Sequence, residues 1–337
     1  MHFVLEKGAS VRSLMRLMRL LRSPSVDPPN AIILCNFAIR FAALATLVLV
    51  FAIVYAFGIR PSQLHWGATA EEISRSMPAD NAVQHPAFDA TRAITIRARP
   101  EQIWPWLVQM GYGRAGFYGY DLIENPGGGS GIRSARTILP QFQNPHPGDI
   151  LPLSVAASLV YGPIEPNHHL VWLGRDDPPS GVFIWQLVPV DDGHTRLISR
   201  IRWRYLHTPV GFALGIFTEF ADHVAVRAIL RGVRDRVEGR EPQSLFSQAC
   251  EIASWFVALF EFLLASAWIL IWHRWKHAWL LAAGAGLLLQ FLLYAGLPVW
   301  LGAPIPLLYL ALMLWAWRAE QHTLSAMKPA DTRVAAS

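Results

Sequence analysis

The chain has 337 residues, of which 53% are hydrophobic and 16% are charged, and its formal net charge is +5. Ordinary soluble domains have about 45–50% apolar and about 25% charged residues, so this composition excludes a purely soluble protein. The mean hydropathy of +0.29 excludes intrinsic disorder, and the two cysteines exclude a scaffold held together by disulfides.

The first segment, residues 1–40, is basic, and its positive charges are patterned. Arg12, Arg16, Arg19 and Arg22 recur every three or four residues between apolar positions. This pattern predicts an amphipathic helix of the kind that lies on an anionic membrane surface. The expected partner of the positive charge is therefore membrane lipid, and no nucleic acid is expected.

Four apolar tracts have the composition of membrane-spanning helices. A helix needs about 20 predominantly apolar residues to cross the hydrocarbon core of a bilayer. The expected spans are residues 41–59, 252–272, 278–296 and 299–317, followed by a flexible tail at 318–337. The Lys and Arg residues near the spans number six before the first, two between the second and third, and at least two after the last. On the other side there are two just after the first span, three just before the second, and none between the third and fourth. The positive-inside rule therefore predicts a multi-pass protein, with cytoplasmic termini and residues 60–251 on the outer side of a bacterial plasma membrane.

The second tract contains one ionisable residue, Glu261, near its centre. An ionisable group in mid-bilayer is costly and suggests a function by default. In an antiparallel hairpin, however, Gln290 of the third tract lies about one helical turn from the same depth. We therefore favour a hydrogen bond between Glu261 and Gln290 that pairs the two helices, ahead of a proton path.

The segment between the first two spans has the pattern of a folded domain. Residues 60–88 are expected to form a linker, in which Thr69 and Glu72 predict a capping box. The domain proper, residues 89–240, is expected to contain strands at 91–97, 149–153, 168–173, 182–188 and 195–205, a helix from Pro100, and a long helix over 209–240. This order predicts an α+β fold with helices packed on an antiparallel sheet.

The apolar positions of the long helix predict its buried stripe. The expected stripe is Ala213, Phe217, Phe220, Val224 and Ala228. Glu219, Asp222 and His223 share another face, at the spacing of neighbours on a helix. We interpret them as an ion-paired face that is solvated or lies at a cavity rim, ahead of a metal site or a proton relay, because no second group of ligands accompanies them.

Several motifs in this domain resemble those of the SRPBCC superfamily. They are WGAT at 66–69, AITI at 93–96, PEQIWPWLV at 100–108, GYGRAGFY at 111–118 and TRLISR at 195–200. The superfamily includes START-like lipid-transfer domains, polyketide cyclases and proteins similar to the birch-pollen allergen. The resemblance covers about residues 66–240 and implies a helix-grip fold, in which a curved antiparallel sheet and a long C-terminal helix surround an apolar cavity.

The resemblance implies a site lined by aromatic residues with few polar groups. The aromatic candidates are Trp104, Tyr112, Phe117, Tyr118, Tyr120, Trp172, Trp185, Trp203, Phe217 and Phe220. The polar candidates are Asp121, Glu124, Glu219 and His223. The implied function is binding or carrying a hydrophobic or lipid-like small molecule. One alternative is an enzyme of the cyclase or dehydrase type, which needs an acid–base pair in the cavity, and another is a membrane scaffold with a filled core.

Motifs for cofactors, metals and nucleophilic catalysis do not have the required context. Gly111, Gly113 and Gly116 match G-x-G-x-x-G, but a predicted helix precedes them and no acidic residue follows at the distance that a dinucleotide requires. His168 and His169 are adjacent on a predicted strand and therefore point to opposite faces. No cofactor, no metal and no catalytic residue is therefore expected.

The last predicted strand carries positive charge on one face. Arg196, Arg200, Arg202 and Arg204 alternate along it with mostly apolar residues. Two interpretations are open, namely a solvated face and a face that contacts anionic lipid headgroups.

Overall fold

The computed structural model describes residues 28–125, 133–205, 208–295 and 297–326. The predicted amphipathic helix with Arg12, Arg16, Arg19 and Arg22 lies outside these residues. Residues 28–40, which we assigned to the basic segment, belong to the first long helix. Residues 318–326, which we assigned to a flexible tail, continue the last helix.

The described residues contain a six-stranded antiparallel sheet with the order β1-β6-β5-β4-β3-β2. Its strands are β1 (Phe88–Ile96), β2 (Ile150–Pro152), β3 (Ser158–Glu165), β4 (His169–Leu173), β5 (Gly181–Asp191) and β6 (His194–Trp203). Strands β2 to β5 each pair with the next strand in the chain, and β1 is the edge strand beside β6. We call the part that contains this sheet the sheet domain. The predicted α+β class is confirmed.

Strand β3 is the element that the sequence pattern did not predict. It contains Gly162 and Pro163, which argue against a strand because proline cannot donate a ladder hydrogen bond. In the structure, the pairing of β3 with β4 shifts register between Tyr161 and Ile164, on either side of these two residues. The irregularity allows the strand to continue past the proline.

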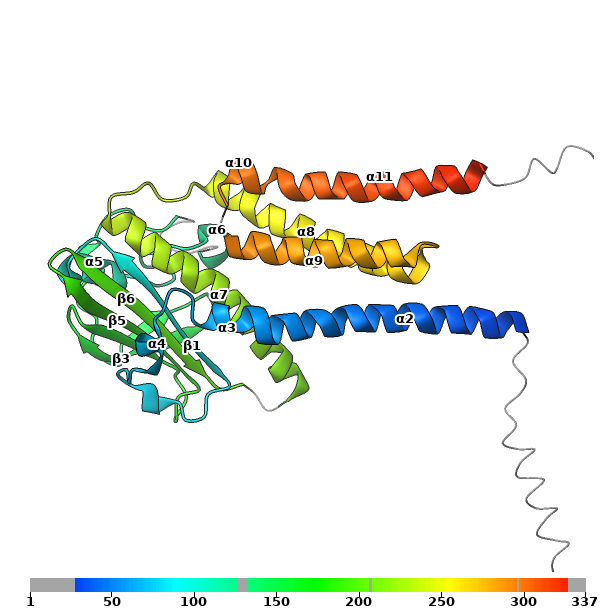
Figure 1. The fold of residues 1–337 in the computed structure, drawn as a ribbon. Coiled ribbons are helices and arrows are strands. Elements are labelled where there is room, and N and C mark those ends of the chain that lie inside the picture. The colour runs from blue at the N-terminus through cyan, green and yellow to red at the C-terminus, as the bar shows by residue number, and fades with distance from the viewer. Residues whose placement is uncertain (1–27, 126–132, 206–207, 296, 327–337) are drawn as a thin grey trace, which may run out of the picture.

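Helices and a buried core cover one face of the sheet. Helix α5 (Pro100–Val108) and helix α7 (Pro209–Val237) lie on this face (Figure 1), and the four-residue helix α6 (Asp121–Glu124) follows α5 in the chain. Ile103 and Leu107 of α5 and Leu230 of α7 are fully buried in one cluster with side chains of the sheet. Their burial removes apolar surface from water and so stabilises the layered arrangement.

The linker covers the opposite face of the sheet. It contains α4 (Ala70–Ser74) and the 3-10 turn η2 (Asp80–Ala82). Met77 and Val83 of the linker are buried against Val182 and Ile198 of the sheet. The predicted capping box is confirmed. The hydroxyl of Thr69 accepts from the backbone amide of Glu72, and the carboxylate of Glu72 accepts from the backbone amide of Thr69. The sheet is therefore covered on both faces.

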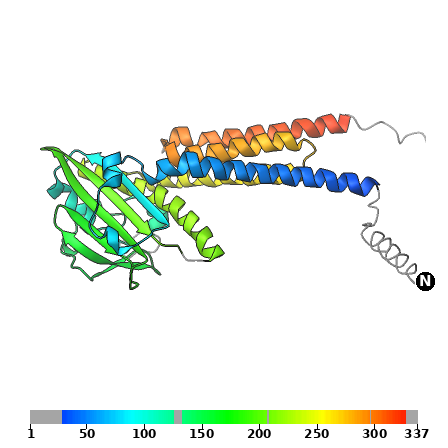
Figure 2. The ribbon, with the colours of Figure 1, turned by 60° about the horizontal axis from the view of Figure 1, so that its bottom comes forward.

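Four helices among the described residues are long and apolar enough to span a membrane. The first combines α2 (Pro28–Val54), the π-helical segment η1 (Tyr55–Ile59) and α3 (Arg60–Leu64). The second and third are α8 (Leu245–Ile271) and α9 (Trp275–Ala295). The fourth consists of the short α10 (Val299–Gly302) and α11 (Pro304–Ala326). We call these four the apolar helices. They run side by side away from the sheet domain, and the start of α2 and the end of α11 lie at the far end (Figures 1 and 2).

Helix α7 is buried on a different side from the one that we predicted. Val226, Ile229, Leu230 and Val233 pack in the core under the sheet. Part of the predicted stripe (Phe220, Val224 and Ala228) faces α8 and α9 instead. Phe217 is 66% exposed, so its predicted burial is wrong. The helix has two apolar faces, and periodicity does not tell which of two apolar partners covers each one.

The predicted hydrogen bond between Glu261 and Gln290 is not formed. Glu261 is fully buried in α8, and among the described residues neither of its carboxyl oxygens bonds to Gln290, whose Nε2 has no hydrogen-bond partner there. Close contact of α8 and α9 is instead supported by small residues, since Ala278 and Ala282 of α9 are fully buried. A Cβ atom at Gly286 would lie 2.4 Å from the ring of Phe51 on α2, so this glycine allows α2 to approach α9 closely.

Candidate functional site

Most of the predicted aromatic residues lie in the core between the sheet and its helices. Trp172 and Trp185 are buried there and contact each other with ring centroids 5.4 Å apart. The buried Phe117 and Tyr118 and the partly buried Trp104, Tyr112 and Trp203 belong to the same core or pack against it. Tyr120 and Phe220 lie in the separate cluster at the apolar helices. The members of this set that belong to the core lie where the helix-grip resemblance implies a ligand.

A large cleft lies elsewhere, where the first apolar helix meets the start of α7. Its volume is about 1280 Å³, and we call it the junction cleft. The first apolar helix contributes Val48, Phe51, Ala52, Tyr55, Ala56 and Arg60, and the rest of the lining is Gln84, His85, Ala87, Arg204, Tyr205, Thr208, Ile216 and Glu219. One long wall is therefore apolar, and polar side chains gather at the end near the sheet domain.

Three of the side chains at the polar end of the junction cleft bond to one another. Arg60 donates from Nε to Oε2 of Glu219 and from Nη2 to Oε1, both over 2.7 Å. The hydroxyl of Tyr205 donates to Oε1 of the same carboxylate over 2.5 Å. The side chain of Glu219 is 5% exposed and that of Arg60 is 35% exposed, so the guanidinium remains accessible from the cleft. Burial and the neighbouring Glu219 raise the pKa of Tyr205, which keeps this hydroxyl a donor.

A glycine on α7 makes this arrangement possible. A Cβ atom at Gly215 would lie 2.6 Å from the ring carbons of Tyr205, well inside van der Waals contact. The absent side chain lets the tyrosine ring lie directly against the helix one turn before Glu219. The position of the hydroxyl that contacts Glu219 therefore depends on residue 215.

A second polar layer lies behind the junction cleft and joins four elements. Arg92 of β1 forms an ion pair with Asp222 of α7 over 2.5 Å and donates to the carbonyl of Gln63 on α3 over 2.8 Å. Nδ1 of His223 lies 3.2 Å from the same carbonyl. Arg227 of α7 donates to two backbone carbonyls at the end of α9. The layer holds the sheet domain against the apolar helices.

Sequence reasoning found only part of these two layers. Glu219 and His223 were polar candidates, and the interpretation of the acidic helix face as ion-paired is confirmed for Glu219 and Asp222. Arg60 and Arg92 were missed. The available signal was weak, because an arginine directly after an apolar tract and an arginine in a strand are both common, and the paired residues lie 159 and 130 positions apart in the chain.

His223 makes the stability of this layer depend on pH. Burial and the nearby charges of Arg92 and Arg227 lower the pKa of His223 to about 3. Between its unfolded pKa of about 6.5 and the folded value, the unfolded chain therefore binds a proton that the folded chain does not. We expect thermal stability in detergent to fall as the pH falls from 6.5 towards 3, and His223→Gln to flatten this fall. His146→Gln, at an exposed site, controls for loss of a histidine, and parallel curves for all three proteins would contradict the prediction.

The two remaining polar candidates lie on α6, away from the junction cleft. Oδ1 of Asp121 accepts from the hydroxyl of Ser134 over 2.5 Å and from the amide of Asn125 over 2.9 Å. Glu124 lines a pocket of about 180 Å³ beside Tyr112 and Phe117. Burial raises the pKa of Glu124 to about 8.

The acid–base pair that a cyclase or dehydrase needs is not assembled from these candidates. Asp121, Glu124 and Glu219 each line a different cleft. The buried ring of His223 stacks against Tyr294 with centroids 5.8 Å apart. In the described parts of the chain, no three His, Cys, Asp or Glu side chains are grouped so that they could hold a metal ion.

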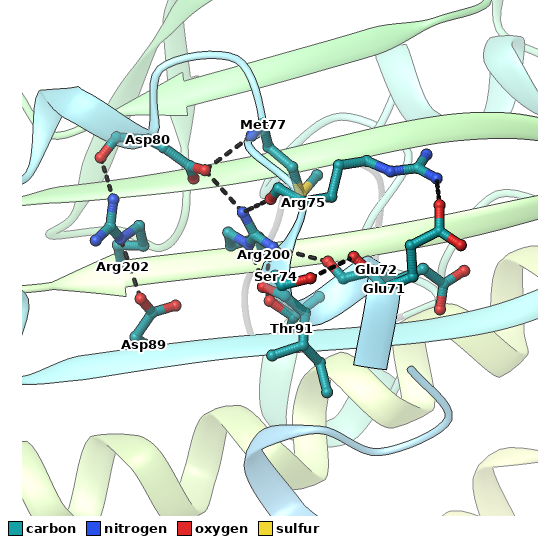
Figure 3. A network of polar contacts seen from close by, with 11 residues as sticks. Glu71, Glu72, Ser74, Arg75, Met77, Asp80, Asp89, Thr91, Arg200 and Arg202 are labelled. Atoms are coloured by element: carbon teal, nitrogen blue, oxygen red, sulfur yellow. Dashed lines mark hydrogen bonds and ion pairs between the residues drawn. The ribbon is translucent and has the colours of Figure 1, made fainter. Parts of the chain in front are cut away.

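The basic face of β6 is occupied by the chain itself. Arg196 pairs with Glu72 of the linker, and Arg202 pairs with Asp89 of β1. Arg200 pairs with Asp80 and bonds to linker carbonyls (Figure 3). Arg204 donates to two carbonyls of the β4–β5 loop. The first three arginines therefore fasten the linker and the neighbouring strand, and neither open interpretation of this face describes them.

Comparison with known proteins finds only distant structural similarity. No protein-family model and no curated protein matches this chain. Similar solved structures include a polyketide-cyclase-like protein from Corynebacterium glutamicum, with 14% identity and a TM-score of 0.29 over 44% of this chain and 91% of that chain. A protein from Mesorhizobium loti has 17% identity and a TM-score of 0.28 over 45% and 98% of the two chains. A conserved protein of unknown function from Enterococcus faecalis has 14% identity and a TM-score of 0.28 over 48% and 77%. At these values the similarities assign neither a ligand nor a reaction.

Proposed function

We propose that this chain is a multi-pass membrane protein that binds an amphiphilic membrane lipid in the junction cleft. The observation that carries the proposal is the form of the cleft, which has an apolar wall along α2 and a charged, hydrogen-bonding end at Arg60, Tyr205 and Glu219. An acyl chain fits the wall, and a headgroup fits the end. The sheet domain then lies on the outer side of the membrane, as the distribution of Lys and Arg predicts.

The size of the junction cleft supports a lipid over a small polar ligand. Pockets for small molecules usually enclose roughly 300–1,000 Å³, and this cleft has about 1280 Å³. Its apolar wall includes Val48, Phe51 and Ala52 of α2 and Ala56 of η1, which follow one another along one side of the first apolar helix. A ligand that contacts all of them must be long and apolar.

The charges at the polar end favour an anionic headgroup. Arg60 and Arg204 contribute two positive charges, and Glu219 offsets one of them. Arg204 is oriented by bonds from Nη2 to the carbonyls of Pro178 and Pro179, which leave its positive charge in place. Guanidinium groups bind phosphate oxygens with charge-assisted hydrogen bonds. A lipid with a net negative phosphate headgroup is therefore the proposed ligand.

This proposal moves the ligand from the interior of the sheet domain to its junction with the apolar helices. The interior position implied by the family resemblance contains packed tryptophans such as Trp172 and Trp185. Of the predicted site residues, Glu219 lines the junction cleft, and Phe217 is its exposed near neighbour on α7. The proposed activity is binding, and no chemical step is included.

The test measures lipid retention by native mass spectrometry of the full chain in detergent. The probes are phosphatidylglycerol and phosphatidylcholine with identical dioleoyl chains. We expect the wild-type chain to retain phosphatidylglycerol preferentially. Ala52→Trp with Ala56→Trp fills the cleft and should abolish retention of both lipids, whereas Ile53→Trp, on the same helix but outside the lining, should leave it unchanged.

A variant of the polar end separates headgroup recognition from binding itself. Arg204→Gln should reduce the preference for phosphatidylglycerol over phosphatidylcholine while both lipids still bind. Equal retention by the wild type, the Ile53→Trp protein and the cleft-filling variant would overturn the proposed site. Absence of retained lipid from all of them would overturn the proposed function.

A further inference from the structure

The start of α7 presents an apolar surface that no part of the described chain covers. Residues 208–218 contain no charged side chain. Val210, Leu214, Ile216 and Phe217 within it are 43–69% exposed. Contiguous exposed apolar patches on soluble surfaces mark contact sites for proteins or membranes. We call residues 209–218 the apolar start of α7.

The depth of this segment in the membrane can be inferred from the ion pair between Arg60 and Glu219, which lies directly after it in α7. Glu219 comes directly after the apolar start and is bonded to Arg60 over 2.7 Å, so both lie at one level. At a rise of 1.5 Å per residue, Arg60 lies about 30 Å along the helix from Arg40, which equals the thickness of a hydrocarbon core. The tract between the two arginines is uncharged. Arg60 therefore marks the boundary of the core nearest the sheet domain.

The direction of α7 carries its apolar start across that boundary. Figures 1 and 2 both show the beginning of α7 protruding from the sheet domain on the side where α2 extends away from it. Ile216 lines the junction cleft together with Phe51 and Val48. Phe51 and Val48 lie about 13 and 18 Å from Arg60 along the first apolar helix, in the direction away from the sheet domain. The apolar start therefore lies on the bilayer side of Arg60.

We propose that residues 209–218 insert into the hydrocarbon of the leaflet nearest the sheet domain without crossing the membrane. The occupant of the exposed apolar face is then the acyl chains of that leaflet, in contact with Leu214 and Phe217. Because Ile216 of the inserted segment lines the junction cleft, the cleft then opens sideways into the leaflet, and a lipid enters it without passing through water. This inference rests on the proposed membrane spans but not on the binding of any particular lipid.

The test measures the depth of spin labels in the full chain, reconstituted in nanodiscs of phosphatidylglycerol and phosphatidylcholine. Cys35 and Cys250 are first replaced by serine, and single cysteines are then introduced at Leu214 or Phe217. Leu49, exposed near the middle of the uncharged tract between Arg40 and Arg60, is the bilayer reference, and Val155, 85% exposed on the sheet domain, is the water reference. Collision with oxygen reports hydrocarbon, and collision with a water-soluble nickel chelate reports water.

We expect labels at Leu214 and Phe217 to have depth parameters of the same sign as the label at Leu49 and opposite to that at Val155. Values like that at Val155 would overturn the insertion, because the segment would then face water. Protection from both reagents would also overturn it and would indicate a covering protein surface, such as a second copy of the chain. If the label at Leu49 itself reports water, the proposed spans fail, which distinguishes that failure from failure of the insertion.

Discussion

Arg200→Met is expected to lower the free energy of unfolding of the sheet domain by about 3–5 kcal/mol, the range seen when one partner of a buried ion pair is removed. Arg200 is 4% exposed and donates to the carboxylate of Asp80 over 2.7 Å and to the hydroxyl of Thr91 over 2.9 Å. It also donates to the carbonyls of Glu72, Ile73 and Arg75. Without the guanidinium, these acceptors lose the donor that they share, and the carboxylate of Asp80 keeps only the bond from the amide of Met77 (Figure 3).

The measurement is denaturant unfolding of the purified full chain, followed by tryptophan fluorescence, together with trypsin digestion at Arg75. The linker should become cleavable in the variant because its attachment to the sheet is lost. Arg200→Lys should rescue little, since an ammonium group cannot reach five acceptors in these directions. Arg97→Met, at an exposed position of the same domain, is the matched control and should change stability by less than about 0.5 kcal/mol. Equal stability of the Arg200 and Arg97 variants would refute the role of Arg200 in fastening the linker to the sheet.

The second large effect is expected at the buried pair of Arg92 and Asp222. Arg92 is 1% exposed, and the ion pair measures 2.5 Å. Arg92→Met and Asp222→Leu should each cost about 3–5 kcal/mol, because each leaves a buried charge without its partner. Burial raises the pKa of Asp222 and Arg92 opposes this rise, so Arg92→Met should also make the carboxyl take up a proton more readily.

A variant with both Arg92 and Asp222 replaced measures how much of each single loss comes from the interaction between the two residues. Replacing both residues with apolar side chains removes both charges, and such replacements are often neutral for stability. We therefore expect Arg92→Met with Asp222→Leu to recover much of the loss, with a coupling energy of about 0.5–3 kcal/mol in a double-mutant cycle. Simple addition of the two single losses would show that the pair does not act as a unit.

These two sets of arginines explain how the sheet domain is held. Arg200 fastens the linker to one face of the sheet, and Arg92 fastens β1 to α3 and α7 on the side of the apolar helices. The junction cleft lies next to the second attachment, so its walls belong to elements whose relative position is fixed by buried ion pairs. A rigid junction is what a binding site between a domain and a membrane helix requires.

Local patterns in the sequence were sufficient for most of the elements, with strand β3 as the exception. The apolar tracts predict the four long helices, because a bilayer-length apolar run has few other solutions. Alternation of apolar residues predicts most of the strands, and Thr69 with Glu72 predicts the start of α4. Strand β3 was missed because Gly162 and Pro163 are local signals against a strand, and only its pairing with β4 accommodates them at an irregularity.

What the sequence by itself determined is therefore the α+β class, the apolar helices and the polar character of the α7 face that includes Glu219 and Asp222. What only the tertiary structure decided is which partner each of these surfaces meets. Arg60 finds Glu219 across 159 positions of chain, α7 meets α8 and α9 on the face that we assigned to the sheet domain, and Glu261 and Gln290 do not bond. The physical reason is that periodicity encodes the polarity of a face, whereas the identity of its partner depends on packing between segments that are distant in the chain.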